Sequence, residues 1–544
     1  MLARAVAAVL LIAALCAPLT ARASWPEGGI RAGQAGIQVG SIRLWADGSE
    51  RIGVKWVETS TGGSTTSART FTTSGTALYS GGYLAVTEDQ APDELGGIYS
   101  VWRASGNIYS QRVLPTGGYA PGPYYTGQWT VAATASSEML PSVIGDGGGG
   151  SFIAWMVGSS TRLRRMQSDG TSSAGWPDAG VVIGAPTVMN TRFVHDGSDG
   201  VYALIANLDR TRVVRISGSG ALEAGWPAGG VAVSSILQEG GTPAVFELLP
   251  SLGTGVLAAW SETPSGQPRR VLLHRVRSDG TLDPSWPATG VVVATTTGVV
   301  RIAPDGLGGA LIAWHDPAPH LLRVLADGTI APGFSPGGVN PCDAGGAVAS
   351  GYELAVATGP NGGAIVAWFD SRGGPASVRV RWIQGDGTPD PQEPEVARVV
   401  ASSIYGTLGT PLIVSDGGMR AWVAYGKIYN EESYTYKALY LAQVEAIPTV
   451  DVPPGSGGKD LALSPPWPNP ARDEFSVRFT LDRGTAAGLE LFDVSGRLVR
   501  WRTVSGAGEH LERFDRLGAL DPGLYFLRLS LDGETRVARV VLAQ

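Results

Sequence analysis

One pattern of apolar and polar positions recurs along most of the chain: a glycine-rich turn, a short apolar run and a tryptophan. It is clearest in residues 146–155 (DGGGGSFIAW), 305–314 (DGLGGALIAW) and 359–368 (GPNGGAIVAW). Related copies end at Trp56, Trp102, Trp260 and Trp422, and a degenerate copy has Ile205 at the tryptophan position. Successive end positions are separated by 46, 53, 50, 55, 54, 54 and 54 residues. This regularity indicates internal duplication.

The rest of each unit also repeats. After the tryptophan comes a second apolar segment that carries arginine, then Asp-Gly-Thr, and then Trp-Pro-x-x-Gly-Val. In one copy these parts are residues 272–276, 279–281 and 286–291. The Trp-Pro dipeptide also occurs at Trp25, near the start of the chain. A unit of about 50 residues has room for four strands of five or six residues and their turns.

The apolar runs predict strands that are covered on both faces. Residues 364–368 (AIVAW) contain no polar position, and their β-branched side chains and glycine boundaries favour strand over helix. Four-strand units at this period are typical of β-propeller blades. The eight copies predict an all-β fold with a seven- to eight-bladed β-propeller. An open β-solenoid is the alternative, although a ring hides the strand edges that a solenoid exposes.

The composition agrees with a β-rich chain. Glycine accounts for 77 of the 544 residues, roughly twice its usual share, and it disfavours helix by about 1 kcal/mol per position. Hydrophobic residues make up 43%, which excludes a disordered chain. The 41 basic and 48 acidic residues give a net charge of −7. This excess of acid argues against nucleic acid or anionic lipid as the main partner.

The N-terminus predicts an export signal at residues 1–23. A basic start is followed by the uncharged residues 5–21, and small side chains at Ala21 and Ala23 fit cleavage between Ala23 and Ser24. An uncleaved membrane anchor is the alternative. Later segments do not reach the roughly 20 apolar residues of a membrane span. We therefore expect an exported protein without a transmembrane span after cleavage.

The cysteine content points to a fold without disulfides. Cleavage of the signal would remove Cys16, and the remaining Cys342 could not form an internal disulfide. The core must then supply the stability. We expect Cys342 to be buried and chemically inert.

The pattern changes after the propeller, which we place at residues 24–447. Residues 448–460 are rich in Pro, Gly and Ser and predict a linker. Residues 461–544 contain no copy of the repeat and alternate as half-buried strands do, for example in residues 475–479 (FSVRF). Six or seven such strands predict a small C-terminal Ig-like β-sandwich.

Both parts resemble known bacterial sequences. The repeats, which read Asp-Gly-x-Gly-Gly-x-x-x-Ala-Trp and continue into an Arg-Val strand such as residues 108–113, resemble those of secreted bacterial β-propeller repeat proteins. That resemblance covers about residues 25–446 and implies a propeller, but no agreed activity.

Residues 461–544 resemble the C-terminal sorting domains of the bacterial type IX secretion system and the related Ig-like domain of the flagellar hook-capping protein FlgD. The matching positions are Pro468, Asn469, Pro470, Gly496, Arg497, Gly523 and Tyr525, followed by the terminal residues 539–542. The resemblance implies contact with the secretion machinery, passage through the outer membrane, and release or attachment at the cell surface. An ordinary Ig-like module without a sorting role is the alternative.

The repeats suggest candidates for chemistry, each with a structural alternative. Acidic residues recur two positions after the tryptophan: Glu58, Glu262, Asp316 and Asp370. Gathered on one face, they could bind calcium or act on a glycosidic bond. The alternative, which we favour, is that they cap turns or pair with strand arginines such as Arg275 and Arg323. Tryptophans at loop tips could stack on sugars, but their repetition at strand ends favours packing within blades.

We predict no catalytic residues, no cofactor and no metal site. His315 and His320 flank Asp316, but their spacing fits no zinc motif, so we interpret them as part of a loop.

Three functions remain open at this point. The first is a non-enzymatic protein of the cell surface or extracellular space whose propeller binds a glycan or a protein. The second is a secreted polysaccharide hydrolase or lyase with paired carboxylates. The third is a structural protein of the envelope or matrix.

Overall fold

The computed structural model describes residues 25–445 and 462–542, with gaps between and within strands. The gaps are residues 26–28, 33–37, 47–50, 61–62, 79–87, 117, 123–126, 134–137, 185, 208–209, 235–244, 252–254, 317, 343–353, 371–375, 395, 405–410, 418–419 and 432–433, and in the C-terminal part 465, 468, 470, 473, 482–486, 494–497, 516, 518–519, 521 and 532–533. Contacts divide the chain into two compact units, Met1–Pro448 and Thr449–Gln544. The signal with Ala23 and Ser24, Cys16 and the whole expected linker 448–460 lie outside the described residues, so these boundaries stay predictions.

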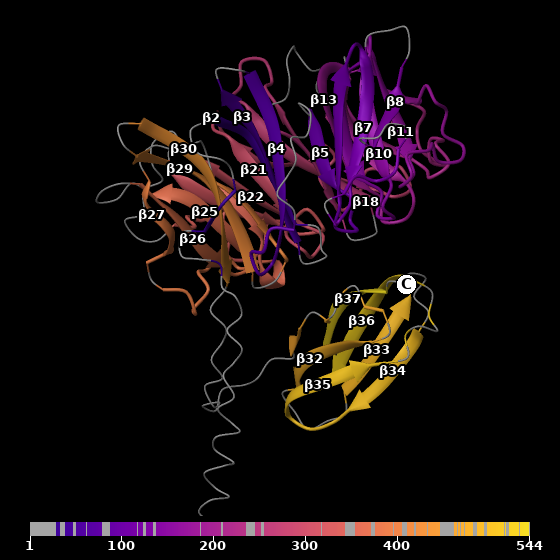
Figure 1. The fold of residues 1–544 in the computed structure, drawn as a ribbon. Helices are drawn as coiled ribbons and strands as arrows, with labels where there is room; N and C mark the ends of the chain where they lie inside the picture. Colours follow the sequence, from indigo (N-terminus) through magenta and orange to yellow (C-terminus); the bar gives the residue numbers. More distant parts are fainter. Residues whose placement is uncertain are drawn as a thin grey trace, which may run out of the picture. The chain divides into compact units, whose positions relative to one another are not determined.

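The first unit is a β-propeller whose described residues form eight antiparallel sheets (Figure 1). We number these sheets as blades 1 to 8 in chain order. Blades 1 to 4 consist of β2 (Gln38–Ala46), β3 (Arg51–Ser60) and β4 (Gly63–Thr72); β5 (Asp89–Pro92), β6 (Ile98–Ala104), β7 (Asn107–Val113) and β8 (Gln128–Ala132); β9 (Glu138–Gly145), β10 (Ser151–Val157), β11 (Ser160–Met166) and β12 (Val181–Gly184); and β13 (Pro186–His195), β14 (Val201–Asn207), β15 (Thr211–Ile216) and β16 (Val231–Ala232).

Blades 5 to 8 consist of β17 (Phe246–Pro250), β18 (Gly255–Glu262), β19 (Arg270–Arg277) and β20 (Val291–Thr295); β21 (Val300–Pro304), β22 (Ala310–His315) and β23 (Pro319–Val324); β24 (Ala355–Thr358), β25 (Ala364–Asp370), β26 (Ala376–Ile383) and β27 (Arg398–Ile404); and β28 (Leu412–Ser415), β29 (Arg420–Glu431) and β30 (Tyr434–Glu445) with β1 (Ile30–Arg31). A short 3₁₀ helix, η1 (Pro360–Gly362), precedes β25. The degenerate copy forms a complete blade 4, where Ile205 is buried in place of tryptophan.

The ring is closed by strands from both ends of the propeller. β1 pairs antiparallel with β30, so the N-terminal strand completes blade 8, which is otherwise built from the last repeat. Each pair of consecutive blades shares a cluster of buried apolar side chains, and one cluster joins blade 8 to blade 1. Between blades 1 and 2 that cluster contains only Ala68 and Val113. This interface is the exception in an otherwise apolar ring.

The repeat tryptophans pack inside the blades. Trp155, Trp260 and Trp368 on the second strands are at most 1% exposed, and Trp176, Trp226 and Trp286 of the Trp-Pro turns are at most 6% exposed. These six side chains are therefore not presented to a soluble ligand, as the blade-packing interpretation expects.

The Trp-Pro tryptophans join neighbouring blades. Each lies against a glycine turn after the third strand of the next blade, and its indole N–H donates to a carbonyl of that turn. Trp176 donates to Gly218 at 2.7 Å, Trp226 to Ser278 at 3.0 Å and Trp286 to Ala326 at 3.1 Å. Such a flat contact needs a glycine, because a Cβ on Gly328 would lie 2.7 Å from Cδ2 of Trp286. We call this contact the blade latch.

A second repeated device explains the Asp-Gly-x-Gly-Gly motif and the strand arginine. One carboxylate oxygen of Asp146 accepts the backbone N–H groups of Gly148 and Gly150, at 2.9 and 2.7 Å. The other oxygen binds Arg165 on β11 at 3.0 Å, and Arg165 also donates to the Asp199 carbonyl of the next blade. The same pairing recurs in Asp93–Arg112, Asp196–Arg215 and Asp305–Arg323. The motif thus fixes the turn and ties it to the third strand.

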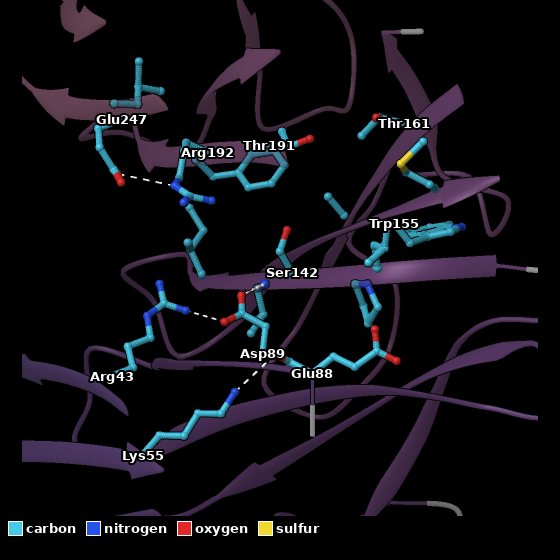
Figure 2. Close-up of a pocket in the computed structure, with 18 of the residues that line it drawn as sticks. Arg43, Lys55, Glu88, Asp89, Ser142, Trp155, Thr161, Thr191, Arg192 and Glu247 are labelled. Carbon is cyan, nitrogen blue, oxygen red and sulfur yellow. Dashed lines mark hydrogen bonds and ion pairs between the residues drawn. The ribbon is translucent and has the colours of Figure 1, made fainter. Parts of the chain in front are cut away.

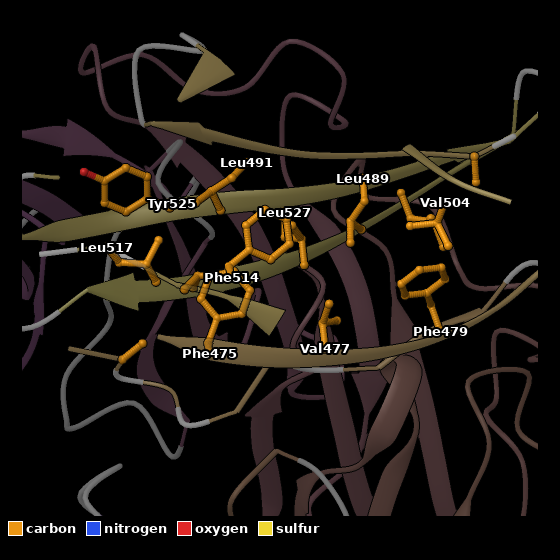
Figure 3. Close-up of a cluster of buried hydrophobic side chains, with 14 of the residues drawn as sticks. Phe475, Val477, Phe479, Leu489, Leu491, Val504, Phe514, Leu517, Tyr525 and Leu527 are labelled. Atoms are coloured by element: carbon orange, nitrogen blue, oxygen red, sulfur yellow. The ribbon is translucent and has the colours of Figure 1, made fainter. Parts of the chain in front are cut away.

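The C-terminal unit is a β-sandwich of two antiparallel sheets. One sheet has the order β31 (Ala462–Leu463), β32 (Phe475–Leu481) and β35 (Gly508–Phe514). The other has the order β34 (Leu498–Val504), β33 (Ala487–Asp493), β36 (Gly523–Leu531) and β37 (Glu534–Leu542). Phe475 and Phe479 of the first sheet face Leu489 and Leu527 of the second across a shared core (Figure 3).

The blade latch predicts unequal costs for two glycine substitutions. Gly328 and Gly266 both have positive φ, 85° and 71°, so alanine strains the backbone at either site. Only the alanine at Gly328 would also meet the Trp286 ring, since nothing lies within 4 Å of a Cβ on Gly266. We expect Gly328→Ala to lower the free energy of unfolding by about 1–2 kcal/mol more than Gly266→Ala. Urea unfolding measures both variants, and equal losses would contradict the latch.

Candidate functional site

A cavity of about 660 Å³ opens among the inner strands of blades 1 to 5. Its wall includes residues from β2, β5, β9, β13 and β17, which are the first strands of five consecutive blades (Figure 2). The cavity begins at the interface between blades 1 and 2, where apolar packing is least extensive.

An ion pair joins blades 1 and 2 at this cavity. The guanidinium of Arg43 on β2 binds Oδ1 of Asp89 on β5 and donates to the Gln90 carbonyl at 3.0 Å. The second carboxylate oxygen of Asp89 accepts the backbone N–H of Val143 on β9 at 3.0 Å. Asp89 is thereby fixed from two blades. The Arg43 side chain, 49% exposed, keeps an open edge.

A second ion pair joins blades 4 and 5. Nε of Arg192 on β13 lies 3.3 Å from Oε2 of Glu247 on β17. The side chains are 42% and 45% exposed, so both face solvent in the cavity. In Figure 2 the two ion pairs lie on one side of the view, and Trp155 and Thr161 lie on the other.

Lys55 breaks the repeat beside the first ion pair. It directly precedes Trp56 on β3, whereas the other blades have a small or apolar residue at this position: Val101, Ala154, Leu204, Ala259, Ala313, Ala367 and Ala421. Lys55 is only 6% exposed, and its ammonium donates to the Glu88 carbonyl at 3.1 Å. Burial lowers the pKa of Lys55, an effect that the nearby Asp89 carboxylate partly opposes.

Leu140 forms an irregular part of the cavity wall. It has φ of +53°, and the pairing of β9 with β10 shifts register between Ala154 and Met156. A leucine in this left-handed region is strained. Leu140 is 39% exposed. The bulge thus turns an apolar side chain toward solvent next to Pro141 and Ser142, which also line the cavity.

This wall can donate and accept hydrogen bonds in close alternation. Its three basic and three acidic side chains are Arg43, Lys55, Arg192, Glu88, Asp89 and Glu247, so their formal charges cancel. Hydroxyl groups come from Ser142, Thr161 and Thr191. Each lining carboxylate has an arginine partner: Glu88 lies 3.9 Å from Arg103, and the other two belong to the ion pairs above. Such a surface is suited to holding a polar ligand.

Among the described carboxylates that follow the repeat tryptophans, Glu262, Asp316 and Asp370 do not line this cavity. Glu262 accepts from the Trp260 indole at 3.1 Å and from Arg270 at 2.8 Å, and Asp370 lies 3.2 Å from Arg379. Both are buried. The preferred interpretation as arginine partners therefore fits these two residues.

The prediction that Arg275 and Arg323 supply those partners was wrong. Arg323 binds Asp305 of the turn, and Arg275 lies 3.6 Å from Asp283. Both arginines lie near the end of the third strand, close to the turn before the second strand, whereas Glu262 lies at the other end of its strand pair, opposite Arg270. The side chain of Glu58 is outside the described structure.

The interpretation of His315 and His320 as loop residues was wrong, because His315 is the last residue of β22 and His320 lies on β23. The His320 ring stacks on Trp314 with centroids 4.8 Å apart, and its Nδ1 lies 2.8 Å from the Gly337 carbonyl. Asp316, between the two histidines, is exposed. Across the described residues, no group of three or more His, Cys, Asp or Glu side chains could hold a metal ion. Cys342 is buried, as expected.

Three of the expected sorting residues lie in the described part of the sandwich. The Asn469 side chain donates to the Arg539 carbonyl at 2.9 Å and accepts from the Val541 N–H at 2.7 Å, so it covers the edge of β37. Gly523 begins β36, and Tyr525 on the same strand is buried opposite Asp493. The remaining motif residues lie outside the described structure: Pro468, Pro470, Gly496 and Arg497.

One protein family matches the sequence of this sandwich. Residues 466–543 match the family described as "Secretion system C-terminal sorting domain". The C-terminal unit is thus similar to such sorting domains. It marks the chain for export by type IX secretion to the cell surface or the extracellular space, and it implies interaction with that secretion machinery. Within the described residues, no helix has the length and apolar character that crossing a membrane requires.

Several solved structures are similar to the chain at low identity. A protein of unknown function from Dyadobacter fermentans is 13% identical, with 58% of this chain and 96% of that chain covered and a TM-score of 0.28. Dipeptidyl peptidase 4 of Porphyromonas gingivalis is 8% identical (84% and 65%, TM-score 0.38). An endo-arabinase of Bacteroides thetaiotaomicron is 11% identical (47% and 94%, TM-score 0.23). No curated protein matches the chain.

Burial of Lys55 predicts a pH-dependent stability difference. The folded chain holds the Lys55 proton less tightly than the unfolded chain, whose pKa is near 10.5. As pH rises from the lowered pKa toward 10.5, Lys55 becomes neutral in the folded chain but stays protonated in the unfolded chain. The cost of burying its charge is therefore lost over this range. We expect the free energy of unfolding of the natural protein, relative to Lys55→Met, to increase between pH 7 and pH 10.

Urea unfolding at several pH values measures this difference. Arg301→Met is the control, because arginine does not titrate in this range and Arg301 on β21 does not line this cavity, so its difference from the natural protein should stay nearly constant. Parallel pH curves for the natural protein and Lys55→Met would show that Lys55 does not titrate differently on folding.

Proposed function

We propose that this exported chain is a binding protein whose propeller recognises a glycan or protein ligand in the cavity among blades 1 to 5. The observation that carries the proposal is the pair of partly exposed ion pairs, Arg43–Asp89 and Arg192–Glu247, on the wall of a cavity of 660 Å³. That volume is within the range of small-ligand sites, about 300–1,000 Å³. Packing a ring of blades does not require open charged side chains there, so a ligand gives them a role.

A polysaccharide hydrolase or lyase has less support from the same residues. A glycosidase needs two carboxylates that are free to act as acid and as base or nucleophile. Both oxygens of Asp89 accept hydrogen bonds from other blades, and Glu247 is paired with Arg192. A purely structural role would not explain the open cavity. Binding without turnover is therefore the function that we propose.

The proposal includes the route of export. The predicted signal at residues 1–23 would direct the chain across the inner membrane before the sorting domain acts. The sandwich also keeps its resemblance to the Ig-like domain of FlgD, and the repeats keep theirs to secreted bacterial propeller proteins. Neither resemblance assigns a ligand, so the cavity carries that part of the proposal.

A glycan and protein screen tests the binding function. The full exported protein is purified from the culture medium or from the cell surface, and N-terminal sequencing is expected to begin at Ser24. It is then applied to glycan and surface-protein arrays, and each glycan hit is assayed for new reducing ends. We expect at least one hit without turnover, and at least tenfold weaker binding for Arg192→Gln.

Arg301→Gln is the matched control, because Arg301 is an exposed arginine on β21, a first strand that does not contribute to the cavity. It should bind like the natural protein. Turnover of a hit would favour the hydrolase, and the absence of any hit that depends on Arg192 would overturn cavity binding.

A further inference from the structure

We propose that the cavity takes a neutral saccharide and that its two ion pairs are the groups that hold the sugar hydroxyls. This inference rests on the proposed binding function and adds the chemical class of the ligand. It depends on three properties of the wall: balanced charge, adjacent donors and acceptors, and limited size.

The charge of the wall is balanced locally. Each guanidinium at the cavity has a carboxylate partner, Asp89 for Arg43 and Glu247 for Arg192. Lys55 is buried against the Glu88 carbonyl and near Asp89. A ligand with a net charge would compete with these pairs, so a charge of the ligand or of the wall would be left without a partner. An unpaired charge in such a site is costly. A neutral ligand leaves both pairs intact.

Each pair offers a donor edge beside an acceptor edge. Arg192 uses only Nε toward Glu247, through Oε2, so its two Nη groups can donate and Oε1 of Glu247 can accept. Arg43 uses Nη1 toward Asp89 and the Gln90 carbonyl, which leaves Nη2 and Nε. Two neighbouring sugar hydroxyls need the same combination, because one oxygen accepts while the other hydroxyl donates. Bonds to charged groups are stronger than those between neutral groups.

The rest of the wall also fits a sugar. Ser142 and Thr191 add hydroxyl groups, and Leu140, 39% exposed at the bulge, adds apolar surface that a sugar's C–H face can cover. A protein partner would instead need roughly 800 Å² of its own surface in contact. A cavity of 660 Å³ among inner strands admits a few sugar rings or a short peptide segment, but not such a surface.

The test is calorimetric titration of the full exported protein with oligosaccharides of one length. The neutral probes are the hexamers of β-1,4-glucose, β-1,4-xylose, β-1,4-mannose and α-1,5-arabinose, and the acidic probe is hexagalacturonate. We expect at least one neutral hexamer to bind, with an affinity that changes less than twofold between 50 and 500 mM NaCl. Hexagalacturonate should bind at least tenfold more weakly than that hexamer.

Two variants separate the ion pair from general polarity. Arg192→Gln should weaken the neutral hexamer at least tenfold, because it removes donors and leaves Glu247 unpaired. Glu247→Gln should leave a net positive wall, and hexagalacturonate should then bind at least tenfold more tightly than it binds the natural protein. Arg301→Gln again serves as the unchanged control.

The outcomes distinguish this inference from the proposed function. Tighter, salt-sensitive binding of hexagalacturonate or of a charged peptide to the natural protein, lost in Arg192→Gln, would overturn the neutral class but keep cavity binding. Binding of a neutral hexamer that Arg192→Gln does not change would overturn the role of the ion pairs. Failure of all four neutral hexamers would also overturn the inference, whereas failure of the array screen concerns the proposed function itself.

Discussion

The propeller depends on one contact, an aromatic ring of one blade laid flat on a glycine turn of the next. This contact combines ring burial with an indole hydrogen bond, as in Trp226 to the Ser278 carbonyl at 3.0 Å. At the closure of the ring the same contact is made by Trp25, which donates to the Thr73 carbonyl at 2.8 Å and lies beside Gly75. Because Trp25 precedes β1 of blade 8 and Thr73 follows β4 of blade 1, the first residues of the described chain join the two ends of the propeller.

The interface between blades 1 and 2 is held mainly by polar contacts, and it lies at the cavity. Its buried apolar cluster is small, and Arg43, Arg51 and Lys55 reach across it to Asp89, Gly96 and Glu88. A closed ring of apolar interfaces can contain one polar interface because its neighbours fix the blades on either side. The apolar interfaces thus stabilise the ring, and the polar interface contributes to the cavity that we propose as a binding site.

The sequence predicted the parts of the fold that repeat. Period, glycine turns and apolar runs gave the blades, and the Trp-Pro and Asp-Gly motifs correspond to the latch and to the Asp146–Arg165 type of pair. The predicted sandwich was also confirmed by the two packed sheets, and the family match at residues 466–543 supports its predicted sorting role, whereas the individual motif residues stay predictions. The repeated features could be predicted because each motif occurs several times along the chain.

The candidate site could not be read in the same way. Arg43, Asp89, Arg192 and Glu247 lie on first strands, which carry no repeated motif, and they meet only because the ring brings β2, β5, β13 and β17 to one centre. The strained Leu140 has no sequence signal either, because its φ follows from a register shift. Lys55 did have a signal: it is a lysine where seven other copies have a small or apolar residue. A search for residues that break the repeat finds it.

The most direct measurement of ring closure is hydrogen exchange of the propeller in a Trp25→Ala variant. The side chain lies at the single closure point, so its loss should reduce amide protection in blade 1 and blade 8 together, along β3 and β29 as well as near Thr73. Trp501→Ala, at a tryptophan 66% exposed in the sandwich, should leave both blades unchanged. Faster exchange confined to residues 72–76, with β3 and β29 as protected as before, would contradict the account that the latch closes the ring.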